Sequence, residues 1–248
     1  MTSVRTFLGA ATIAAVVLAV GFALYALAKS RPQDLPWTPL DLGETPGMFT
    51  GRKIAALGDD FAQCRTLLDR AGVRYVALEP VRPADTACGY ADGVRPTGGA
   101  AALRYAPAAL GMACPVAAGM AMLEWNVIQP AAERHFGAKV RTIEHFGSYN
   151  CRRMYGRSQG DYSQHATADA IDLSGFVLSD GTRISVVGDW TAKDGKLAAE
   201  KAAFLREVRD GACDLFATVL SPDYNAAHRD HFHLDQANRG MGGWRACR

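Results

Sequence analysis

A long uncharged segment near the N-terminus constrains most strongly what this chain can fold into. From Thr6 to Ala28 run 23 residues that are rich in Ala, Val and Leu, and Arg5, Lys29 and Arg31 flank them. As a helix this segment is about 34 Å long, which is enough to cross the hydrocarbon core of a bilayer. Because it is apolar on all sides and has no capping pattern, a buried core helix is a poor alternative.

A cleavable signal peptide has an apolar region of only about 7–15 residues, so an uncleaved anchor is favoured. Ala26-Leu-Ala28 nevertheless fits a small-residue cleavage site. We therefore predict that residues 1–29 are an N-terminal transmembrane anchor, with a removed signal peptide as the alternative. The flanking positive charges do not fix the orientation of this segment.

Six cysteines lie beyond the apolar segment, at positions 64, 88, 114, 151, 213 and 247. None forms the Cys-x-x-Cys pair that is typical of structural zinc. In an exported chain an even number predicts three disulfides, and we expect sequential pairing: 64 with 88, 114 with 151, and 213 with 247. Reduced thiols in a cytosolic protein are the alternative, which export disfavours. Disulfides place the N-terminus inside and the globular part outside.

The remaining chain divides into a linker and one domain. Residues 30–46 contain four prolines, which predicts an extended tether. Residues 47–248 are long enough for one well-packed domain. The whole chain has 27 basic and 25 acidic residues, a net charge of +2, and no basic stripe with interleaved aromatic residues. Nucleic acid is therefore not an expected partner.

Helical and strand patterns are mixed along this domain, without a βαβ rhythm or a glycine-rich phosphate loop. Apolar residues at helical spacing predict helices, and β-branched or alternating runs predict strands. The expected helices are 59–71, 115–136 with a kink or break at Pro130, and 198–209; the expected strands are 73–78, 141–146, 170–178, 182–187, 215–220 and 231–234. This pattern predicts an α+β fold with a central antiparallel sheet and flanking helices.

Three of the six histidines lie within six residues near the C-terminus, in the sequence His228-Arg-Asp-His231-Phe-His233-Leu-Asp235. If this segment is a strand, alternation places His231, His233 and Asp235 on one face. The two apolar residues between them would then anchor the opposite face in a core. One face could bind a metal.

A second cluster of polar residues lies about 60 residues upstream. Polar and apolar residues alternate at its end, and this alternation places Asp172 on the polar face of a strand. Zinc hydrolase sites use three protein ligands and leave a fourth position for water. His165, Asp172 and His233 would supply such a set. His231 would point into the same cleft as a candidate general base or transition-state stabiliser, with His228 nearby. Either half alone would also suit a polar surface, but the two together predict a mononuclear metal centre.

These residues carry a family resemblance. His165 and Asp172, followed by His231-Phe-His233, resemble the signature of the LAS metallopeptidases, which include lysostaphin-type enzymes, D-Ala-D-Ala peptidases and the zinc domain of hedgehog proteins. The resemblance implies that His165, Asp172 and His233 bind one Zn²⁺. The additional His228 is similar to the penicillin-insensitive murein endopeptidase branch, in which extra histidines line the active site.

In the residue available as general base, this sequence differs from many D-Ala-D-Ala peptidases, which carry a glutamate upstream of the last ligand. Here His228 and Asp230 occupy that neighbourhood and no glutamate does. The base is therefore either His231 or a water held by its neighbours. Arg152, Arg153 and Arg157 precede the first ligand cluster, where solvated surface charge is the simpler interpretation and an arginine fork for a peptide carboxylate is the alternative.

A closer resemblance covers nearly the whole soluble part. The chain resembles the bacterial extensin-like C-terminal domain family in these segments: Leu35-Pro-Trp-Thr-Pro-Leu, Cys64 with Leu67-Leu-Asp-Arg-Ala-Gly-Val, Glu144-His-Phe-Gly-Ser-Tyr-Asn-Cys-Arg-Arg, and those around His165 and His228. That family is assigned to the peptidase-like zinc fold by similarity, so the resemblance implies a fold and a site more than a reaction.

Together these features predict a membrane-tethered, extracytoplasmic zinc metallopeptidase-like protein that hydrolyses amide bonds in peptidoglycan peptides, as a murein endopeptidase or DD-carboxypeptidase does. We expect it in the bacterial inner membrane, single-pass, with its C-terminal domain in the periplasm. The alternative is a non-catalytic, zinc-stabilised peptidoglycan-binding module. The presence of His231 and His228 favours the enzyme, since a structural zinc has no need of them.

Overall fold

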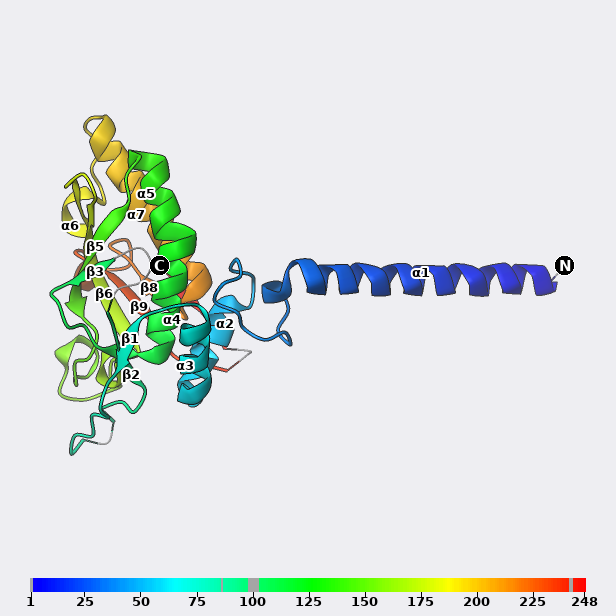
Figure 1. The fold of residues 1–248 in the computed structure, drawn as a ribbon, viewed down its shortest axis with the longest axis horizontal. Coiled ribbons are helices and arrows are strands. Elements are labelled where there is room, and N and C mark those ends of the chain that lie inside the picture. The colour runs from blue at the N-terminus through cyan, green and yellow to red at the C-terminus, as the bar shows by residue number, and fades with distance from the viewer. Residues whose placement is uncertain (1, 86, 98–102, 241–242) are drawn as a thin grey trace.

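A long N-terminal helix precedes a globular α+β part in the computed structural model, which describes residues 2–85, 87–97, 103–240 and 243–248 (Figure 1). Helix α1 (Thr2–Ser30) projects away from the globular part. Its stretch Thr6–Ser30 is long and apolar enough to cross a membrane. The predicted apolar helix is therefore confirmed, while its role as an uncleaved anchor stays a prediction.

The globular part contains helices of very different lengths and two sheets. The helices are α2 (Thr50–Ala55), α3 (Phe61–Arg70), α4 (Cys114–Leu123), α5 (Gln129–Phe136), α6 (Val186–Asp189) and α7 (Lys196–Leu215), with the π-helix η3 (Glu124–Ile128) and the 3₁₀ turns η1 (Pro32–Asp34), η2 (Ala56–Asp59), η4 (Met154–Gly156), η5 (Gln164–Thr167) and η6 (Ala226–His228). The strands are β1 (Tyr75–Ala77), β2 (Gly93–Pro96), β3 (Arg104–Ala106), β4 (Met112–Ala113), β5 (Val140–Gly147), β6 (Ala170–Leu178), β7 (Arg183–Ser185), β8 (Thr218–Leu220), β9 (Phe232–Asp235) and β10 (Ala246–Cys247).

The larger sheet has the strand order β10-β8-β9-β6-β5-β3, and β7 pairs with β6 outside this path. Its central pairings are antiparallel, whereas the edge strands β3 and β10 pair in parallel with their neighbours. Strands β1, β2 and β4 form a smaller antiparallel sheet. Helices α4, α5 and α7 cover one face of the larger sheet (Figure 1). The predicted α+β class is confirmed, with a sheet that is mixed at its edges.

Alternation along β6 and β9 separates a core face from a polar face. In the antiparallel register Ile171 pairs with Leu234, and Asp172 pairs with His233. Both apolar residues are fully buried in the core, as is Phe232. Burial of each such side chain contributes about 1.5–3 kcal/mol. A one-residue slip would exchange the two faces, so the core residues fix the position of the polar ones.

Residues 30–46 do not form the extended tether that the prolines predicted. Gln33 is only 2% exposed, and Lys53 Nζ donates a hydrogen bond to its Oε1 atom. Leu40 and Leu42 are buried in the core cluster. The prolines exclude long regular elements from this segment, but its apolar side chains still pack against the domain. The end of α1 is therefore joined to the core by folded chain.

Three disulfides link the domain, and no cysteine in the described residues is free. The expected sequential pairing is right for Cys213–Cys247 and wrong for the other two bonds, which are Cys64–Cys114 and Cys88–Cys151. The first ties α3 to the start of α4, and the second ties the loop before β2 to the segment between β5 and η4. Pairing depends on which elements pack together, and cysteine spacing does not show this.

Three further expectations differ from the structure in detail. The helical stretch 115–136 continues past Pro130, because the π-helix η3 directly before it changes the local hydrogen-bond pattern. In the expected strand 182–187, the last residues belong to α6. In the expected strand 215–220, α7 continues to Leu215 and β8 begins at Thr218.

Candidate metal centre

Three short elements bring the predicted ligands together. Asp172 and His233 are register partners on β6 and β9. His165 lies in η5, and the side chain of Ser163, the residue directly before this turn, accepts the His165 backbone N–H. The turn is followed by Ala168, which has a left-handed backbone conformation with φ of 61°. This sharp turn directs the chain from His165 straight into β6.

The three ligand atoms form a nearly equilateral triangle. His165 Nε2 lies 3.1 Å from Asp172 Oδ1 and 3.1 Å from His233 Nδ1, and the last two atoms are 3.0 Å apart. All three residues are buried, and the group could hold a metal ion. Tetrahedral zinc with bonds of about 2.0–2.1 Å needs donor atoms roughly 3.3 Å apart, so small adjustments would suffice.

Outer hydrogen bonds fix which ring nitrogen of each histidine faces the group. His165 Nδ1 lies 2.6 Å from the carbonyl oxygen of Ser148, which can only accept, so Nδ1 carries the proton. His233 Nε2 lies 3.3 Å from Asp235 Oδ2 and donates to that carboxylate. The inward nitrogens therefore present lone pairs next to Asp172 Oδ1. Three converging acceptors, with an outer partner for each of the two histidines, are typical of a metal site.

The charges of the group favour a cation. Burial alone would raise the pKa of Asp172, but hydrogen bonds and charges from His165 and His233 hold that pKa well below its usual range. Burial lowers the pKa of His233, yet its bonds to Asp172 and Asp235 outweigh burial and raise the pKa to about 9. A proton can thus occupy the group at neutral pH, and a divalent cation would displace it.

His231 lies beside this group without belonging to the triangle. Its Nε2 is 3.6 Å from Asp172 Oδ1, and its Nδ1 donates to Asp230 Oδ1 over 2.9 Å. The side chain is mostly buried, and its ring packs edge-on against Phe146. The carboxylate of Asp230 therefore holds this imidazole with its second nitrogen toward the candidate ligands.

His228 completes the histidine cluster. Its ring centroid is 5.3 Å from that of His231 and 5.9 Å from that of His233. Its Nδ1 donates to Asn225 Oδ1 over 2.8 Å. Burial and the neighbouring imidazoles lower the pKa of His228 to about 4, so the ring is neutral at physiological pH. A neutral ring offers its Nε2 as a hydrogen-bond acceptor.

A cleft of about 200 Å³ exposes part of this cluster. Arg152 contributes to its wall, whereas Arg153 and Arg157 stack on Tyr162 and Tyr155. The two remaining histidines lie elsewhere and make ordinary structural contacts: His135 with Glu207, and His145 with the carbonyl of Pro107.

Sequence reasoning did not assign the outer partners. Asp235 has the same strand phase as His233 and follows it by two residues, so the alternation could have suggested its role. Asp230 adjoins His231, but adjacency alone does not predict a hydrogen bond. Ser148 acts through its backbone carbonyl, for which the side-chain type gives no signal.

Fold and site together define a disulfide-linked α+β domain with a candidate metal centre, preceded by an apolar helix that could anchor it in a membrane. Within that class, the chain belongs to the family of the extensin-like protein C-terminus, whose family model matches residues 62–248. The matched region contains all the candidate site residues and all six cysteines. Comparison with curated proteins and with solved structures gave no match.

Proposed function

We propose that this protein is a membrane-tethered, extracytoplasmic zinc metallopeptidase with a LAS-type fold that hydrolyses amide bonds in peptidoglycan peptides. The observation that carries the proposal is the triangle of three buried acceptor atoms, 3.0–3.1 Å apart, beside two histidines that are not needed as ligands. Three nitrogen and oxygen ligands with one side open to a cleft suit catalytic zinc. The three disulfides and the apolar helix support a location outside the cytoplasm.

Zinc at this site would polarise an amide carbonyl and make water more acidic. His231 would accept a proton at Nε2, because Asp230 holds its Nδ1–H and orients the ring. Asp230 also stabilises the charge that His231 acquires. Neutral His228 would orient water or substrate through its free Nε2, and Asn225 fixes its ring. Asp235 and Ser148 keep the ligand nitrogens directed inward.

Metal content of the full-length protein in detergent tests the ligand set. We expect about one zinc per chain, sharply reduced in His165→Ala, Asp172→Ala and His233→Ala. His231→Ala should retain the metal, and His135→Ala is a matched control because His135 pairs with Glu207 away from the cleft. Full zinc content in His233→Ala would remove His233 from the ligand set.

Release of fragments from purified peptidoglycan, read by mass spectrometry, tests the reaction. The zinc-loaded wild type should release peptide fragments, and His231→Ala should be slower by roughly 10²–10⁴-fold with its zinc content unchanged. His228→Ala should show a smaller loss. If wild type and His231→Ala bind peptidoglycan equally and neither releases fragments with zinc present, the protein is a binding module and not a peptidase.

A further inference from the structure

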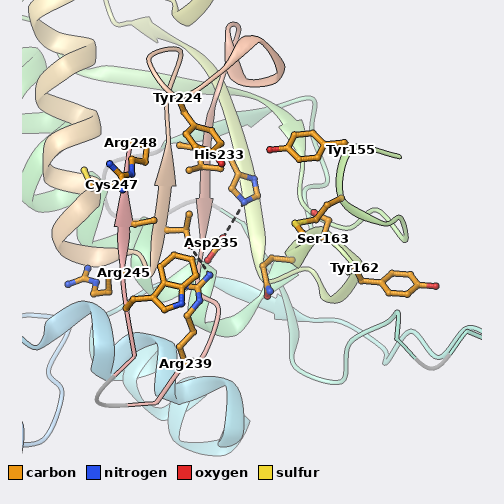
Figure 2. Close-up of a pocket in the computed structure, with 16 residues that line it drawn as sticks. Tyr155, Tyr162, Ser163, Tyr224, His233, Asp235, Arg239, Arg245, Cys247 and Arg248 are labelled. Atoms are coloured by element: carbon orange, nitrogen blue, oxygen red, sulfur yellow. Dashed lines mark hydrogen bonds and ion pairs between the residues drawn. The ribbon is translucent and has the colours of Figure 1, made fainter. Parts of the chain in front are cut away.

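A second, larger cavity of about 610 Å³ adjoins the metal cleft (Figure 2). The two spaces are adjacent, since they share these wall residues: Met154, Tyr155, Ser163, Leu220 and His233. Figure 2 shows the ring of His233 between those of Tyr155 and Tyr224, with Arg239 beyond Asp235. The volume is typical of small-ligand sites. A molecule in this cavity would therefore lie directly beside one of the candidate metal ligands.

Arg239 is held in this cavity by neutral partners. Its Nη2 donates to Thr218 Oγ1 over 3.1 Å, and its guanidinium lies 4.0 Å from the ring centroid of Trp244. Nη1 is buried and has no hydrogen-bond acceptor among the described residues. Among the residues that the structure describes, other arginines form ion pairs with carboxylates, and Arg239 forms none. A buried guanidinium N–H without an acceptor is costly, so the guanidinium of Arg239 has hydrogen-bonding capacity that the described residues do not use.

The charge of the cavity wall also favours an anion. Arg239, Arg245 and Arg248 contribute to the wall, and Asp235 is the one acidic side chain among its described residues. Both oxygens of Asp235 already accept hydrogen bonds, from a ligand histidine and from a backbone N–H. Arg245 donates to two backbone carbonyls and so holds the chain. Arg239, in contrast, is held by a hydroxyl and a ring and forms no ion pair among the described residues.

We propose that Arg239 binds a free carboxylate of the substrate peptide and so selects peptides that carry such a group near the scissile amide. This inference rests on the proposed function, since it takes the peptide in the larger cavity to be the one that is cleaved at the metal cleft. A guanidinium can pair with a carboxylate through two parallel hydrogen bonds. Stacking on Trp244 keeps the guanidinium plane in one orientation, which favours this geometry.

Calorimetric titration of zinc-loaded, full-length protein in detergent tests the inference with two probes, acetyl-Lys-D-Ala-D-Ala and its C-terminal amide. The wild type should bind the acid roughly 10–100-fold more tightly than the amide, as charged hydrogen bonds of this kind predict. Arg239→Gln should bind both peptides with the affinity of the amide. Arg239→Lys should keep part of the preference, because it retains the charge and loses the fork. Arg70→Gln is the control, since Arg70 is an exposed arginine of α3.

The inference is overturned if the wild type binds neither peptide, if it binds both equally, or if Arg239→Gln keeps the preference for the acid. Thermal unfolding and zinc content show whether Arg239→Gln is folded; if it is not, the peptide comparison in the wild type and in Arg239→Lys decides. Mass spectrometry of the same samples separates the two proposals. If the protein releases fragments but does not prefer the acid over the amide, only this inference is refuted. If it prefers the acid but cleaves neither the peptides nor peptidoglycan, the proposed peptidase function is refuted.

Discussion

Substitution of Asp235 by Asn removes one acceptor from a carboxylate that uses two. Oδ2 accepts the Nε2–H of His233 over 3.3 Å, and Oδ1 accepts the backbone N–H of Ala237 over 3.1 Å. The Asp235 side chain is only 5% exposed, so water has little access to replace a lost bond. An asparagine side chain has a single oxygen, and it can satisfy only one of these two donors.

Both orientations of the new amide are unfavourable. If its oxygen stays with Ala237, its NH₂ group faces His233 Nε2, and that nitrogen must give up its proton. The proton then resides on Nδ1, which can no longer bind a metal. If the oxygen turns to His233, the NH₂ group faces the Ala237 N–H. The second arrangement loses one buried hydrogen bond, about 1–3 kcal/mol. The first keeps a hydrogen bond, but binding of zinc at Nδ1 would return the proton to Nε2 and break it. In the first arrangement this loss corresponds to a zinc affinity roughly 10–100-fold weaker.

Competition with a chromophoric chelator at pH 7.5 measures zinc affinity directly. Asp235→Asn should bind zinc roughly 10–100-fold more weakly than the wild type. Asp169→Asn is a matched control, because Asp169 is also a partly buried carboxylate of this region and accepts from Thr167. Its zinc affinity should be unchanged. If Asp235→Asn binds zinc as tightly as the wild type, Asp235 does not control the proton position on His233.

Three further predictions concern stability in denaturant. Burial, with neighbouring carboxylates, raises the pKa of Asp169 to about 7, so its ionisation opposes folding as pH rises from about 4 to 7. Asp169→Asn should therefore stabilise the protein by roughly 1–3 kcal/mol at pH 8 and little at pH 4, and equal gains at both would contradict this. Replacing Cys88 and Cys151 together by Ser should cost about 4 kcal/mol, because the bond closes a long loop; a loss below about 1 kcal/mol would refute this. Phe232→Ala should cost about 3–5 kcal/mol, and wild-type stability would exclude Phe232 as a core anchor of β9.

Alternation made the ligand-bearing strands predictable. Phe232 and Leu234 are apolar at every second position, and this pattern alone places His233 on the opposite face. The same argument applies to Asp172 between Ile171 and Leu173. Local periodicity is readable from sequence because burial acts on each strand separately, and a slip would exchange core and surface.

Features that depend on distant packing could not be predicted in this way. The bond between Cys64 and Cys114 forms because α3 packs beside α4, and neither spacing nor composition encodes that contact. Arg239 follows the last ligand by six residues in a segment without periodicity, so its stacking on Trp244 and its place in the cavity depend on the tertiary fold. Its position near His233 could therefore be found only from the structure.

The folded connection between α1 and the domain fixes the working distance of the site. A flexible chain of the same 17 residues would give the domain a reach of roughly 20–25 Å around its anchor. Here Gln33 and Leu42 are packed into the domain instead, so the domain does not have this range of positions around its anchor. The helical layer lies between α1 and the larger sheet, and the ligands occupy the opposite sheet face (Figure 1). If α1 lies in a bilayer, the metal cleft would thus face away from the membrane at a fixed distance from it. A substrate would then have to reach the cleft at that distance.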